Sequence, residues 1–122
     1  MSLADHSVTA SIEKRLKTAS REINQLAPLL GQAKQVLSFE SDRRKNLLAK
    51  YAAKHLADES AAAAEQLARA DPAYLSDLEV LAGEVQTAYG VIAKNDALHC
   101  TWESARSLLA LVREQIRTMP EN

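Results

Sequence analysis

The chain has 122 residues and a mass of 13.3 kDa, which fits a single domain. Hydrophobic residues make up 47% of it and charged residues 25%, a balance that excludes wholesale disorder. The net charge is -1. Alanine and leucine supply 39 positions, whereas glycine and proline supply 3 each, so the composition favours helices and excludes a β-sandwich or barrel.

The composition also indicates the cellular compartment in which the protein works. The single cysteine, Cys100, excludes an internal disulfide and a cysteine-rich zinc site, and it fits a reducing environment. No apolar run approaches the roughly 18–20 residues that cross a bilayer, and no signal peptide opens the chain. We therefore expect a cytoplasmic protein with no membrane partner.

The first predicted helix covers residues 5–37. Its apolar residues recur at alternating spacings of 4 and 3, a repeat typical of a helix packed along another helix. The repeat consists of Ile12, Leu16, Ala19, Ile23, Leu26, Leu30, Ala33 and Leu37. Pro28 removes one backbone hydrogen bond inside this repeat, but the repeat keeps its phase. We therefore expect a kink near residues 24–31 rather than a helix end.

The next stretch is less regular. The sequence Ser-Phe-Glu-Ser at residues 38–41 indicates a break, and a second, basic helix is predicted over residues 40–56. Residues 60–70 contain four consecutive alanines, which have high helix propensity but little apolar surface to bury. This stretch is predicted to be a short helix or a connector.

A long helix is predicted over residues 72–119. Asp71 can cap its start, and Pro72 suits the first helical position because its missing N–H costs nothing there. A repeat with spacings of 4 and 3 returns near the C-terminus, and Pro120 is expected to end the helix. Its members are Leu98, Trp102, Ala105, Leu109, Val112, Ile116 and Met119.

The length of this helix bears on the architecture. At 1.5 Å per residue it would be about 70 Å long, about twice the diameter of a compact globule of this size. We expect an all-α protein, either an elongated helical hairpin or a bundle of three to four helices with coiled-coil-like packing. A hairpin would leave apolar surface in water, which favours a homo-oligomer. Leu98, Trp102, Leu109, Val112 and Ile116 would form its oligomer or core seam. The alternative is a kinked, monomeric bundle.

Charge is divided along the chain. Residues 14–54 carry a net charge of +7 and residues 55–103 a net charge of −7. On a helical projection Arg43, Lys50 and Lys54 fall within about 40° of one another, with Tyr51 and Arg44 alongside. These five residues, here called the basic strip, would suit a nucleic-acid backbone and one stacked base. The alternative is that the strip faces the acidic segment and is neutralised by it.

No catalytic constellation is evident. The sequence has no glycine-rich phosphate loop. His99 and Cys100 are adjacent, so on a helix they diverge by about 100° and cannot form a nucleophile–base pair. No histidine or acid pair at helical spacing indicates a metal site. We expect a protein that is not an enzyme, without cofactor, metal or small-molecule substrate, unless several chains build a shared site.

The stretch from Phe39 to Tyr51 resembles the central basic helix of the UvsY-type recombination mediators of T-even-like phages, which are small helical proteins of similar length. The residues that carry this resemblance are Glu40, Arg43, Arg44, Leu47, Ala49 and Lys50. The resemblance implies an oligomeric phage protein that binds single-stranded DNA and helps to load a recombinase. Arg43, Lys50 and Lys54 would then contact phosphate, with Arg44 and Tyr51 beside them.

Two functions follow as hypotheses. The first is a non-enzymatic phage-type accessory protein that binds single-stranded DNA in recombination through the basic strip. The second is a self-associating assembly or protein-interaction module, in which charge serves packing only.

Overall fold

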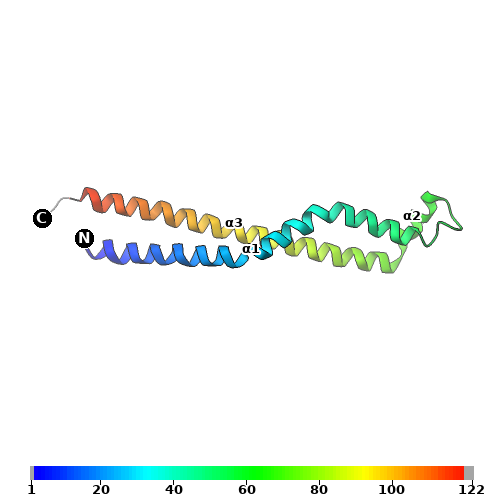
Figure 1. Ribbon diagram of the computed structural model, residues 1–122, viewed down its shortest axis with the longest axis horizontal. Helices are drawn as coiled ribbons and strands as arrows, with labels where there is room; N and C mark the ends of the chain where they lie inside the picture. Colours follow the sequence, from blue (N-terminus) through cyan, green and yellow to red (C-terminus); the bar gives the residue numbers. More distant parts are fainter. Residues whose placement is uncertain (1, 120–122) are drawn as a thin grey trace. The chain divides into compact units, whose positions relative to one another are not determined.

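The computed structural model describes the backbone of residues 2–119 and the side chains of residues 7–119. It contains three α-helices in the order α1 (Ser2–Ala52), α2 (Ala61–Ala70) and α3 (Pro72–Thr118), and no strand among the described residues (Figure 1). The predicted all-α class and the very long C-terminal helix are therefore confirmed. The predicted end of that helix at Pro120 lies outside the described residues.

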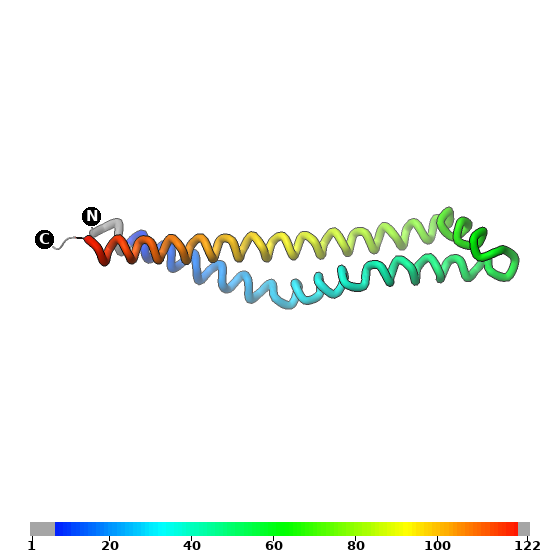
Figure 2. The backbone as a smooth tube through the Cα atoms, turned by 90° about the horizontal axis from the view of Figure 1, so that it is seen from above, coloured from blue at the N-terminus to red at the C-terminus, as the bar shows by residue number. Residues whose placement is uncertain are grey.

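The chain divides into two compact units. The terminal unit comprises Met1–Leu29 with Ile92–Asn122, and the central unit comprises Leu30–Val91. In each unit a stretch of α1 runs antiparallel to a stretch of α3 (Figure 2). Each unit therefore builds its own core from helices that are neighbours in space but distant in sequence.

The α1 repeat is buried at every second member. Ile12, Ala19, Leu26 and Ala33 are at most 6% exposed. The alternate members, Leu16, Ile23, Leu30 and Leu37, are half-buried. A helix with a single long partner presents only one row fully to it, and the neighbouring row stays at the edge of the contact.

The core of the terminal unit joins the N-terminal part of α1 to the C-terminal part of α3. Ile12 packs with Ala105 and Leu109, and the half-buried Leu16 and Val112 border this cluster. Next to it Arg113 donates to Glu13 at 3.2 Å, so an ion pair links α1 to α3 at the edge of the core. The C-terminal repeat of α3 thus serves as core in this unit.

The predicted break at residues 38–41 is wrong, because α1 continues to Ala52. The stretch holds no proline or glycine, and Glu40 accepts hydrogen bonds from Arg44 one turn later, which stabilises the helix at this point. The basic helix predicted to reach residue 56 ends at Ala52 and is followed by turns. Pro28 lies inside α1, which does not stop there.

Asp71 joins α2 to α3. Its backbone N–H donates to Ala68 at the end of α2, and its side chain accepts from the N–H of Ala73 at 2.9 Å. The predicted aspartate cap before Pro72 is therefore confirmed. At the other end of α2, Ser60 caps the helix by accepting from the N–H of Ala63 at 3.2 Å.

One pair of neighbouring residues tests how strongly burial stabilises the central unit. Leu81 is 1% exposed and Val80 is 61% exposed. Leu81→Ala should lower the free energy of unfolding by about 2–5 kcal/mol, because it removes apolar contacts and leaves a cavity. Val80→Ala should change it by less than about 0.5 kcal/mol. Urea denaturation followed by circular dichroism measures both, and equal effects of the two variants would contradict this packing.

Candidate functional site

The basic strip is the first candidate site, and an acid on α3 neutralises one of its members. Arg43 donates to Glu84 at 2.5 Å, linking α1 to α3 within the central unit. This hydrogen bond raises the pKa of Arg43 and lowers the pKa of Glu84. At this position the structure therefore agrees with the alternative in which the basic segment faces the acidic one.

Arg44 is also paired with an acid. Its guanidinium donates to Glu40 through Nε at 3.1 Å and Nη2 at 3.0 Å, on the same helix one turn away. Both side chains remain partly in solvent, so salt screens this pair and the bond contributes little to stability. A nucleic-acid phosphate that binds Arg44 would nevertheless have to displace the Glu40 carboxylate.

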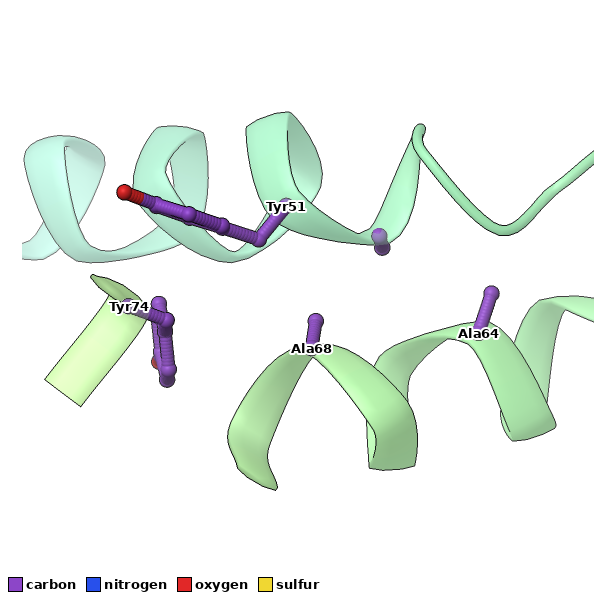
Figure 3. Close-up of a cluster of buried hydrophobic side chains, with 5 residues drawn as sticks. Tyr51, Ala64, Ala68 and Tyr74 are labelled. Carbon is purple, nitrogen blue, oxygen red and sulfur yellow. The ribbon is translucent and has the colours of Figure 1, made fainter. Parts of the chain in front are cut away.

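Tyr51 does not offer its ring to a base. Only 5% of the residue is exposed, and its ring meets that of Tyr74 edge-on with the ring centroids 5.7 Å apart (Figure 3). Ala64 and Ala68 of α2 belong to the same buried cluster, and their small side chains let α2 approach closely. The sequence suggested one base stacked beside the strip, but the ring of Tyr51 is buried, because α2 and the start of α3 cover this end of α1.

The hydroxyl of Tyr51 is held by a hydrogen bond as well. It donates to Oδ2 of Asp77 at 2.5 Å, which, together with burial, raises the pKa of Tyr51 to about 12. Because the neutral phenol is the donor, loss of its proton would break the bond and leave two negative charges in contact. This bond joins the last turn of α1 to the beginning of α3.

The two lysines of the strip lie around this ring. Lys54 Nζ is 4.5 Å and Lys50 Nζ is 5.5 Å from the centroid of the Tyr51 ring, and both residues are exposed. Neither forms an ion pair with a carboxylate within the described residues. Of the five predicted site residues, the structure thus leaves only Lys50 and Lys54 without an acidic partner, and both lie against Tyr51.

The predicted seam residues divide by depth. Leu109 is 6% exposed, Leu98, Trp102 and Val112 are half-buried, and Ile116 is 39% exposed. The partner that covers Leu109 is α1 of the same chain. The middle of the seam is therefore core, whereas Ile116 at its end stays exposed.

A second row on α3 was not predicted and lies one residue away from the seam. Its members are Ala97, Thr101, Ser104, Leu108, Leu111 and Gln115. The spacings are again 4 and 3, and all six residues are exposed and uncharged. Leu108 and Leu111 are 40% and 56% exposed. The apolar repeat that found the seam does not find this row, because Thr101, Ser104 and Gln115 are polar.

A groove in the terminal unit was also missed. It is lined by Leu16, Lys17, Ser20, Arg21, Asn24, Gln25 and Trp102. The guanidinium carbon of Arg106 lies 5.3 Å from the centroid of the Trp102 ring. No helical projection of α1 alone could show this groove, because Trp102 and Arg106 come from α3.

The described residues give no sign of a metal centre, since no group of three or more histidines, cysteines or acids is placed to hold an ion. None of the helices in residues 2–119 is long and apolar enough to cross a membrane.

Comparison with known proteins finds no matching family model, no matching curated protein and no matching solved structure. The resemblance to the UvsY-type mediators stays a prediction.

The hydrogen bond between Tyr51 and Asp77 predicts a shifted titration. The pKa of this phenol is raised from 10.0 to about 12, so the stabilisation from the bond is complete below pH 10 and is lost as the pH rises through about 12. The difference in tyrosinate absorbance between the wild type and Tyr51→Phe isolates this group among the three tyrosines. Asp77→Ala should lower its midpoint, whereas Glu79→Ala, which removes an exposed neighbouring acid, should not. A wild-type midpoint near 10 would contradict the bond.

Proposed function

We propose that this protein is a non-catalytic helical assembly module that associates with copies of itself through α3 of the terminal unit. The observation that supports this proposal is the width of the apolar surface on that part of α3. Leu108 and Leu111, here called the flank, are 40% and 56% exposed. Large apolar side chains gathered on one side of a helix mark an interaction surface.

A helical projection gives the width of this surface. From Leu111 through Leu108 to Leu109, the apolar arc spans about 160° at 100° per residue. A helix packed on one neighbour needs an apolar stripe about 100° wide. Helix α1 buries the side of the arc that holds Ala105 and Leu109, and the flank stays uncovered. The arc is thus wide enough for a second helix.

The chemistry of the flank favours a second copy as the occupant. The row from Ala97 to Gln115 carries no charge, although a quarter of the chain is charged, so two copies would meet without like-charge repulsion. The charges nearby are already satisfied, because Arg117 pairs with Glu114 and Arg113 with Glu13. A row with spacings of 4 and 3 also matches itself, as an interface between identical subunits requires.

This proposal is tested by the mass of the protein in solution. Size-exclusion chromatography with light scattering should give a multiple of 13.3 kDa for the wild type. The double variant Leu108→Glu/Leu111→Glu should run as a monomer, because four or more carboxylates would face one another in the interface.

The matched control is Leu75→Glu/Val80→Glu, which adds the same charge on exposed apolar positions of the central unit. It should keep the wild-type mass. Circular dichroism of both variants shows whether the helices remain folded. A wild type that is monomeric throughout the micromolar range, or a control that dissociates equally, would overturn the proposal.

A further inference from the structure

We propose that the groove beside Trp102 binds single-stranded nucleic acid, with a base against the indole and phosphates at Lys17, Arg21 and Arg106. This inference goes beyond self-association and uses different residues, since no member of the flank lines the groove. It also differs from the basic strip, which lies in the central unit.

Two cations that line the groove and one beside Trp102 have no acidic partner among the described residues. Lys17 and Arg21 are exposed, lie one turn apart on α1 and line the groove, and Arg106 lies one turn after Trp102 on α3. Within the described residues none of the three forms an ion pair with a carboxylate. Arg43 and Arg44 do form such pairs. In the groove, therefore, the arginine and lysine donors all lack an acidic partner, whereas in the strip both arginines are paired and only Lys50 and Lys54 are not.

The acids nearby do not cancel this charge. Glu13 of α1 is held by Arg113. Glu103 follows Trp102 on α3 and is exposed. Glu22 follows Arg21 on α1 and is exposed as well. Neither Glu22 nor Glu103 lines the groove, and three cations against these two carboxylates leave it positive. Neighbouring phosphates are the anions that such a cluster binds with release of counterions.

Trp102 supplies an aromatic surface on which a base could stack, a contact that binding of phosphate alone would not require. The residue is half-buried, so the core fixes part of its indole while another part lines the groove. Aromatic faces stack on unpaired bases, and a guanidinium on the same ring adds cation–π attraction. Asn24, Gln25 and Ser20 line the same groove and can donate to or accept from base edges and sugars.

These features favour a single strand over a duplex or an acidic peptide. In a duplex the faces of the bases are stacked and closed to an indole, whereas a single strand can present them. A peptide of acidic residues would use the cations but would bring no aromatic ring to stack on Trp102.

Trp102 is the only tryptophan, so the protein carries its own probe of this groove. Titration of the full-length chain with an oligothymidylate should quench tryptophan fluorescence. Three phosphate contacts on a single strand predict a fall in affinity of about 20-fold between about 50 and 200 mM salt. A duplex of equal length and a polyglutamate of equal charge should each bind at least about tenfold more weakly.

Variants locate the site, with the anisotropy of a labelled oligothymidylate as the readout. Lys17→Ala/Arg21→Ala should flatten the salt dependence by about 1.4 in the logarithmic slope. Trp102→Phe should weaken binding while keeping that slope. The control Lys34→Ala/Lys45→Ala removes the same charge from exposed positions of the central unit and should stay within about twofold of the wild type.

Several results would overturn this inference. They are binding without quenching, equal losses in the control and the groove variant, or equal affinity for polyglutamate. Absence of any binding by a folded sample would do so as well. The mass of the wild type is measured separately, so failure here leaves the assembly proposal intact.

Discussion

The pairing of α1 with one antiparallel stretch of α3 is the contact on which each unit depends. A helix with one long partner can bury one row of side chains, which is why Ile12, Ala19 and Leu26 are buried while Leu16 and Ile23 stay at the edge. The same limit leaves large apolar side chains in water on the other sides of the helices. Apolar surface that could serve association therefore remains exposed, because each long helix packs against few partners.

The antiparallel order also decides which charges are neutralised. The basic residues near the end of α1 meet the acid-rich beginning of α3, so Arg43 finds Glu84. The cations near the start of α1 lie opposite the C-terminal part of α3, which supplies Trp102 and Arg106 instead of acids at the groove. In the central unit the segregated charges thus meet in the Arg43–Glu84 ion pair, whereas Lys17 and Arg21 at the groove of the terminal unit have no acidic partner among the described residues.

The sequence alone predicted the features that depend on one helix at a time. The repeat on α1 and the cap at Asp71 are local patterns, and both are present. The break at residues 38–41 failed because a serine offers the backbone an alternative hydrogen bond without forcing a helix to end, and here the Arg44–Glu40 pair stabilises the helix. The burial of Tyr51 could not be predicted, because its cover comes from Tyr74 and α2, which no projection of α1 contains.

The two proposed surfaces have a joint consequence. The groove carries only three cations and one indole, which by itself gives a weak, salt-sensitive contact with a nucleic acid. Pairing through Leu108 and Leu111 would place two such grooves in one particle, and a single strand long enough to reach both would bind the second as an intramolecular step. Because the flank and the groove share no residue, self-association could strengthen binding without altering either contact. Self-association would then determine how tightly a single strand is bound, and the residues of the groove would determine which class of ligand is bound.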